Sequence, residues 1–219
     1  MAKLSFPNNT QRMVIVGATG SGKTVAGMWQ LSMRNYDEMP WYVVDFKYDS
    51  LINSIQNATH LDVKSKVPQR PGLYIVHPHP AEADYLEAQM WEVWNQENTG
   101  VFIDEGLMLG TRNNAFRALL TQGRSKHIPM IVLSQRPVWM DRFVFSESEY
   151  FQIFRLQHNK DLRAVNEFIP YDISKRLPEY HSYFYSVPDN RLVVLRPTPD
   201  DDAILSTFDA KLDKLKRAV

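Results

Sequence analysis

Short, uninterrupted runs of hydrophobic residues recur along the chain, separated by longer segments whose hydrophobic residues repeat at helical spacing. The uninterrupted runs predict strands over Arg12–Val16, Trp41–Phe46, Leu73–His77, Val101–Ile103, Met130–Ser134 and Tyr150–Leu156. The segments with helical spacing predict helices over Lys23–Asn35, Ala81–Asn98, Asn113–Lys126 and Asp161–Phe168. Because apolar strands that alternate with helices are typical of parallel sheets, we predict an α/β fold whose mostly parallel central sheet is flanked by helices.

The pattern changes towards the C-terminal end. Residues His181–Val187 and Arg191–Arg196 flank a group of turn residues and predict an antiparallel hairpin. A helix is expected after it, because acidic residues at 200–202 precede an apolar stripe formed by Leu205, Phe208, Leu212 and Leu215. With a boundary near Thr198-Pro199, the chain is expected to form one domain over 1–199 and a helical appendage over 200–219.

Composition excludes several classes of protein. The 219 residues carry no net charge, which argues against a uniformly basic coat for nucleic acid, and 44% hydrophobic residues exclude a wholly disordered chain. The absence of cysteine excludes disulfide frameworks, thiolate nucleophiles and cysteine-based metal sites. No hydrophobic run reaches the length of a membrane span, and the first residues lack the apolar region of a secretory signal, so neither is expected.

The residues after the first predicted strand carry the strongest chemical signal. They fit the pattern G-x-x-x-x-G-K-[ST] of a phosphate-binding (Walker A) loop, and they are Gly17, Ala18, Thr19, Gly20, Ser21, Gly22, Lys23 and Thr24. Glycine lets the backbone N–H groups of such a loop turn inward around phosphate oxygens. Lys23 is expected to reach the β- and γ-phosphates of ATP, and Thr24 is expected to hold Mg²⁺. The alternative is an ordinary turn between a strand and a helix.

Two acids follow the strand at Val101–Ile103. In a phosphate-loop protein they form the Walker B pattern, in which Asp104 acts in the Mg²⁺ shell and Glu105 polarises the attacking water as general base. A base beside the metal-binding acid favours hydrolysis by water over transfer to a small acceptor. Taken without the loop, an acid at a strand end is often no more than a cap.

Two further candidates lie around the strand at Met130–Ser134. Gln135 directly follows this strand and is a candidate to contact the γ-phosphate or the attacking water; the alternative is an amide that satisfies loop backbone. Arg124 lies at the end of the preceding predicted helix and is a candidate arginine finger for a neighbouring subunit, or a cation that stabilises the helix end. Asp45 and Lys47 are interpreted as an exposed pair at a strand end, outside the site.

Three segments together carry a resemblance to a known family: GATGSGKT, VFIDEG and TQGRSKHIPMIVLSQRP. They resemble the FtsK/HerA superfamily of ring-forming, DNA-pumping ATPases, and the small size of the chain resembles the genome-packaging ATPases of internal-membrane icosahedral viruses and phages. The resemblance covers residues 10–197 and implies a RecA-like P-loop fold. In that family an arginine precedes the fourth core strand and a glutamine ends it, which corresponds to Arg124 and Gln135. Similar Asp and Lys residues occur near the nucleotide edge in that family, and this is the alternative for Asp45 and Lys47. The chain has no room for the membrane domain or winged helix of FtsK.

The resemblance implies an ATPase that moves double-stranded DNA, with ATP and Mg²⁺ as cofactors. It favours a hexameric ring and leaves a pentamer open, with a viral capsid vertex or internal-membrane proteins as partners, in the host cytoplasm or on the virion. A ring tolerates the separated charges of this chain, because residues 71–111 carry seven acids and no lysine or arginine, and residues 112–163 carry nine bases and four acids. The alternatives are a DNA pump for conjugation or repair, a virion-extrusion ATPase, a small-molecule kinase and a nucleotide-dependent assembly factor.

Overall fold

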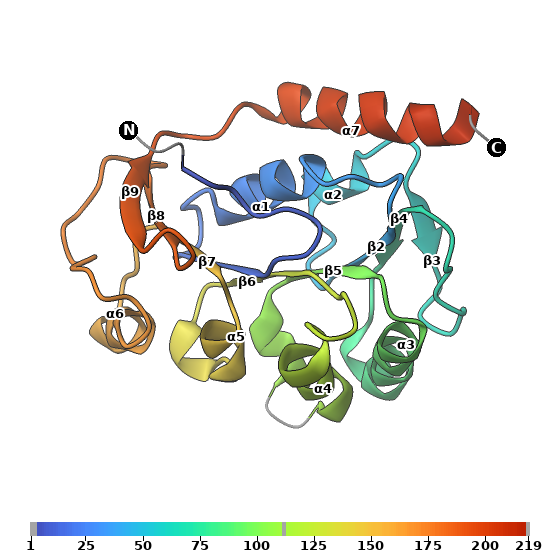
Figure 1. The fold of residues 1–219 in the computed structure, drawn as a ribbon, viewed down its shortest axis with the longest axis horizontal. Coiled ribbons are helices and arrows are strands. Elements are labelled where there is room, and N and C mark those ends of the chain that lie inside the picture. The colour runs from blue at the N-terminus through green and yellow to red at the C-terminus, as the bar shows by residue number, and fades with distance from the viewer. Residues whose placement is uncertain (1–3, 111–112, 218–219) are drawn as a thin grey trace.

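A single central sheet organises the protein, whose computed structural model describes residues 4–110 and 113–217 (Figure 1). Its strands are β1 (Met13–Val16), β2 (Pro40–Asp45), β3 (Thr59–Leu61), β4 (Gly72–Val76), β5 (Gly100–Asp104), β6 (Met130–Ser134), β7 (Tyr150–Ile153), β8 (Ser182–Ser186) and β9 (Arg191–Leu195). Within these described residues the order across the sheet is β3-β4-β2-β5-β6-β1-β7-β8-β9. The pairs from β3 to β7 are parallel, and β8 and β9 add an antiparallel hairpin at one edge.

Helices cover both faces of the sheet. They are α1 (Lys23–Ser32), α2 (Ser50–Asn53), α3 (Ala83–Gln96), α4 (Asn114–Gln122), α5 (Phe143–Ser146), α6 (Asn159–Asn166) and α7 (Asp201–Arg217), with short 3-10 turns η1 (Pro80–Glu82), η2 (Gly106–Leu109) and η3 (Pro137–Trp139). Figure 1 shows α1, α2 and α7 on one face and α3, α4, α5 and α6 on the other. The mostly parallel sheet, the helical layers and the terminal hairpin and helix confirm the predicted fold class.

The strands are buried on both sides, which explains their uninterrupted hydrophobic character. Side chains of β1 alternate between two apolar clusters: Val14 and Val16 pack on the side of α3 and α4, and Met13 and Ile15 pack on the side of α1 and α7. All four side chains are fully buried. A strand enclosed in this way needs apolar residues at every position, so its sequence cannot alternate.

Three elements, β3, α2 and α5, have no counterpart in the sequence-based prediction. The edge strand β3 has exposed or half-buried residues only, so it lacks an apolar run. Helices α2 and α5 are single turns, which are too short for a periodic signal. The Asp49 side chain caps α2 by accepting the Leu51 N–H. The predicted helices also extend past the C-terminal ends that the structure shows. Helix α4, for example, ends at Gln122. Turns follow it directly, and His127 among them adopts the left-handed conformation with φ 54°.

The C-terminal helix α7 lies along α1, outside the sheet (Figure 1). Its buried side chains are Ile204, Phe208 and Leu212, which join the same apolar cluster as α1 and β2. Leu205 and Leu215, both in the predicted stripe, pack only partly buried against that cluster. The division into 1–199 and an appendage over 200–219 stays a prediction, and residues 218–219 lie outside the described part. No helix in the described ranges is long and apolar enough to cross a bilayer.

Candidate active site

The phosphate-loop segment joins the end of β1 to the start of α1, the context that the motif requires. Gly22 immediately precedes α1 with φ 92°, and Gly20 has φ 72°, so both adopt left-handed conformations that favour glycine. A Cβ on Gly17 would lie 2.5 Å from Ser21 Oγ and 2.7 Å from Phe154 Cβ, which leaves no room for a side chain. No side chain caps the first turn of α1, so its backbone N–H groups are available to an anion.

Lys23 and Thr24 begin α1 and point towards the acid pair. Lys23 is almost fully buried, and this burial lowers its pKa, with a further lowering by nearby Lys47 and opposition from Glu105 and Asp104. Thr24 Oγ1 lies 3.5 Å from Asp104 Oδ1. The two motifs are far apart in the sequence, and the parallel arrangement of β1 and β5 brings them to the same edge of the sheet.

The acid pair lies at the end of β5 and is buried. Asp104 is the last residue of the strand, and burial raises its pKa while Lys47 opposes that shift. Glu105 follows with φ 82°, a strained conformation for a residue with a side chain. Burial alone would raise the pKa of Glu105, but Lys47 and the hydrogen bonds from Gln135 outweigh it and lower that pKa.

The side chain of Glu105 is held from two directions. Its Oε1 accepts hydrogen bonds from Ser134 Oγ at 2.9 Å and from the Gln135 N–H at 3.1 Å. Its Oε2 lies 3.0 Å from Lys47 Nζ. Ser134 was not among the sequence candidates, because a serine that ends a strand carries no signal until the neighbouring strand is known.

The structure corrects the interpretation of Asp45 and Lys47 as an exposed pair outside the site. Asp45 is fully buried at the end of β2, and Lys47 Nζ lies 3.3 Å from Asp104 Oδ2 as well as close to Glu105. The error arose because β2 and β5 are adjacent: Asp45 and Asp104 are paired across the two strands. A residue after β2 therefore reaches the acid pair.

Gln135 and Arg124 lie in different places. Gln135 is at the tip of β6, where its Oε1 accepts a hydrogen bond from Thr19 Oγ1 of the phosphate loop. Arg124 follows α4, its side chain is 75% exposed, and it forms an ion pair with Glu149 at 3.8 Å. Because Glu149 directly precedes β7, this arginine lies at the amino edge of the sheet, opposite the phosphate loop. The structure therefore brings Gln135 to the loop of its own subunit and keeps Arg124 away from it.

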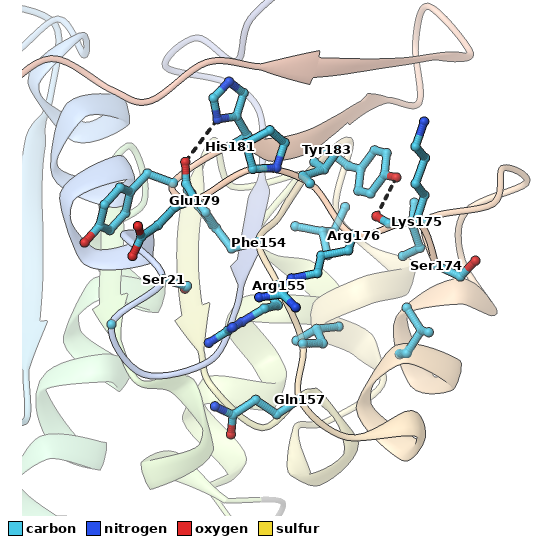
Figure 2. A pocket seen from close by; sticks show the side chains of 18 residues that line it. Ser21, Phe154, Arg155, Gln157, Ser174, Lys175, Arg176, Glu179, His181 and Tyr183 are labelled. Atoms are coloured by element: carbon cyan, nitrogen blue, oxygen red, sulfur yellow. Dashed lines mark hydrogen bonds between the residues drawn. The ribbon is translucent and has the colours of Figure 1, made fainter.

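A pocket of about 700 Å³ opens beside the phosphate loop. It is bounded by Gly20 and Ser21, by the segment after β7 and by the loop at residues 173–183 (Figure 2). Tyr180 lies over the loop, because a Cβ on Gly22 would approach its ring to 3.2 Å. The cations in the lining are Arg155, Lys175, Arg176 and, when protonated, His181. No role for this pocket could be predicted from the sequence, because its lining residues come from separate segments and form no recognisable motif.

Comparison with known proteins identifies the family. No family model matches the chain. It is 44% identical, over 217 residues, to the DNA packaging ATPase P9 of Enterobacteria phage PRD1, covering 94% of this chain and 95% of the relative. The chain belongs to the family of viral DNA packaging ATPases. This relationship confirms the resemblance that the three sequence segments suggested, and the predicted ATPase class.

Solved structures share the fold of this packaging ATPase. The genome packaging NTPase B204 of Sulfolobus turreted icosahedral virus 2, in complex with AMPPCP, matches with a TM-score of 0.70 and 16% identity, over 88% of this chain and all of B204. ATPases 2 and 3 of EssC from Geobacillus thermodenitrificans match with a TM-score of 0.67 and 14% identity, over 95% of this chain and 44% of theirs. At these identities the comparison supports the fold.

The residues of the packaging ATPase also fit a divalent cation at the acid pair. The Thr24 hydroxyl and the Asp104 carboxylate face each other, and Asp104 Oδ2 is balanced within the described residues by the Lys47 ammonium at 3.3 Å. In the described part of the chain no group of three or more His, Asp or Glu side chains is placed to hold a metal ion. Mg²⁺ commonly takes one or two protein oxygens and completes its shell with water and phosphate, so the pair Thr24 and Asp104 matches its needs.

Proposed function

We propose that this packaging ATPase binds Mg²⁺-ATP at the phosphate loop, hydrolyses it and uses the energy to move double-stranded DNA into a viral capsid. The observation that carries the proposal is the convergence of Lys23, Thr24, Asp104, Glu105 and Gln135 at one edge of the sheet. These side chains come from the start of α1 and from the ends of β5 and β6, at the edge where α/β proteins bind their ligands. The name of the phage relative, a DNA packaging ATPase, supports the DNA part.

Each residue has a role in this proposal. Residues 17–22 and the first turn of α1 surround the phosphates with N–H groups, and Lys23 contacts the β- and γ-phosphates. Thr24 and Asp104 would hold Mg²⁺, which neutralises charge on the phosphate oxygens. Glu105 accepts the proton of the attacking water, because its carboxylate is ionised, fixed at Oε1 by Ser134 and lies next to Asp104. Gln135 orients that water or the γ-phosphate.

The pocket beside the loop takes the nucleoside end of the nucleotide. It is continuous with Gly20 and Ser21, so a nucleotide whose phosphates occupy the loop can extend into it. Tyr180 offers an aromatic ring at the boundary between loop and pocket. The cations in its lining suit the negative charge of the bound nucleotide.

Assembly as a ring is the remaining part of the proposal. Arg124 is exposed at the edge opposite its own phosphate loop, so it can serve only a site on another subunit. A head-to-tail ring places one subunit's amino edge near the next subunit's loop and leaves a channel for DNA. We favour a hexamer, with a pentamer as the alternative, working in the host cytoplasm or on the virion with capsid-vertex or internal-membrane proteins as partners.

The decisive experiment measures ATP hydrolysis by the full chain with and without duplex DNA, over a range of salt concentrations. We expect duplex DNA to stimulate turnover, and we expect the stimulation to weaken with salt because phosphate contacts release counterions. Turnover that ignores DNA but requires a small acceptor would replace the motor with a kinase. Sizing with and without ATP, in the same buffers, tests the ring.

A further inference from the structure

The ammonium of Lys47 lies between the two carboxylates of the site. Its Nζ is 3.3 Å from Asp104 Oδ2 and 3.0 Å from Glu105 Oε2. Neither of these oxygens accepts a hydrogen bond from another group in the described part of the chain. In this arrangement the positive charge that balances the acid pair is supplied by the protein itself.

Lys47 is placed there by the buried carboxylate of Asp45. Asp45 Oδ1 accepts the Lys47 N–H at 3.0 Å, and Oδ2 accepts the Asp49 N–H at 2.9 Å. His77 Nδ1 lies 3.2 Å from the same Oδ2. These contacts fix the backbone from which Lys47 extends. Its own side chain is 32% exposed on a flexible stem, so the ammonium can move while the backbone stays in place.

The ammonium and a divalent cation compete for Asp104. A metal held by Thr24 and Asp104 would sit within a few ångströms of the Lys47 ammonium, and like charges repel strongly in a site as buried as this one. Lys47 can keep its contact with Glu105 Oε2 when a metal is bound to Asp104. Ser134 and Gln135 hold the other oxygen of this carboxylate, Oε1, and so keep Glu105 in place. Lys47 therefore has to give up Asp104, but not Glu105, when the metal enters.

We propose that Lys47 is an internal counter-cation that keeps divalent metal out of the nucleotide-free site and holds Glu105 in place. This inference rests on the metal site proposed above. When nucleotide arrives, its phosphates add negative charge, Lys47 leaves Asp104 to the metal, and the ammonium stays with Glu105. Lys47 is thus a positioning residue, and metal enters only together with the nucleotide.

The test measures Mn²⁺ binding to the nucleotide-free full chain by the electron paramagnetic resonance of free Mn²⁺. We expect Lys47→Met to bind Mn²⁺ at least about tenfold more tightly than the wild type, because the competing charge is gone. Lys47→Arg keeps a cation and should behave like the wild type. The matched control is Lys66→Met, which removes the same charge from an exposed position and should leave Mn²⁺ affinity unchanged.

A second substitution locates the new binding. Adding Asp104→Asn to Lys47→Met should abolish the gained affinity, and binding that survives it would overturn the assignment to this site. Equal Mn²⁺ affinity in Lys47→Met and the wild type would overturn the role of Lys47. Should the methionine variant fail to fold, Lys47→Gln, with a polar side chain, repeats the comparison.

A further measurement separates this inference from the proposed function. The wild type with a non-hydrolysable ATP analogue should bind more Mn²⁺ than the analogue binds without protein, and Asp104→Asn should reduce this excess. If it does not, the proposed metal site is wrong, and Lys47 has nothing to exclude. If it does, while Lys47→Met shows no gain without nucleotide, only the role of Lys47 fails.

Discussion

The two adjacent carboxylates of the site have pKa values shifted in opposite directions. Burial raises the pKa of Asp104, whereas Lys47 and the hydrogen bonds from Gln135 outweigh burial and lower that of Glu105. Both lie close to the same ammonium, but the nearby carboxylates of Asp45 and Asp49 further raise the pKa of Asp104, whereas hydrogen bonds from Gln135 further lower that of Glu105. A lowered pKa makes Glu105 a weak base that is always ionised at neutral pH. In the proposed role of general base, Glu105 would therefore act mainly through its fixed orientation.

Glu105→Gln tests the base. The amide keeps the size of the side chain but cannot take a proton, so we expect ATP to bind nearly as before while kcat falls by about 10²–10⁴-fold. Binding is measured with a fluorescent ATP analogue and turnover by phosphate release. The control is Glu167→Gln, an exposed residue that pairs with Arg142 away from the site. An unchanged kcat in Glu105→Gln would remove this residue as the base.

Lys23→Ala tests the loop. Loss of the buried ammonium removes the charge expected on the β- and γ-phosphates, and we expect nucleotide affinity or turnover to fall by at least about 100-fold. Calorimetric titration with an ATP analogue measures the first and phosphate release the second. Lys66→Ala is the matched exposed control. Wild-type turnover in Lys23→Ala would mean that the nucleotide binds elsewhere.

The part of the site that lies in local sequence motifs was predictable. The part that depends on which strands are neighbours was not. The phosphate loop could be recognised because every required residue lies within eight consecutive positions. Lys47 and Ser134 belong to other strands, and their link to Glu105 depends on β2, β5 and β6 being neighbours, which the sequence does not state. The Asp45–Lys47 pair was misjudged for the same reason.

At the scale of elements, the buried strands and the longer helices could be predicted from the sequence. The edge strand and the ends of the helices could not. Strand β6 was predicted to the residue because all of its side chains are buried and apolar or small. The edge strand β3 has no buried side chain and was missed. The fully buried Ile204 of α7 was missed as well, because the expected stripe began at Leu205. Burial produces the hydrophobic pattern that prediction depends on.

Phe208→Ala tests how closely the C-terminal helix belongs to the rest of the chain. Phe208 is fully buried, and its ring centroid lies 6.2 Å from that of Tyr36. Its truncation should lower the free energy of unfolding by about 3–5 kcal/mol, measured by denaturant titration. The control is Lys214→Ala, at an exposed position of the same helix, which should change little. A loss below about 1 kcal/mol would support α7 as a separable appendage.

At the scale of the whole molecule, the acid pair and Arg124 lie at opposite edges of the sheet. The acidic residues Asp104 and Glu105 lie at the carboxyl edge of the sheet, and Arg124 lies at the amino edge beside Glu149. The exposed side chain of Arg124 rests on a partly exposed carboxylate at 3.8 Å, a weak surface pair that another anion can replace. In the proposed ring, the γ-phosphate bound to a neighbouring subunit would be such an anion.

Mixing two inactive variants tests this arrangement. Arg124→Ala should lose most turnover because no arginine reaches the next subunit's phosphate, and Lys23→Ala should lose its own site. In a co-assembled equal mixture, about a quarter of the interfaces would combine an intact loop with an intact arginine from the neighbour, so turnover should reappear. Phosphate release is measured for each variant and for the mixture, with co-assembly checked by affinity-tagged subunits.

The control for the mixing experiment is Arg142→Ala, which removes an arginine that is 72% exposed and paired with Glu167. It should keep its turnover, because Arg142 contacts neither the loop nor the acid pair. If Arg124→Ala and Lys23→Ala co-assemble and the mixture remains as inactive as its components, then Arg124 does not act on a neighbouring subunit. The arginine would then be a cation that stabilises the end of α4, and the ring would need a different residue at its interface.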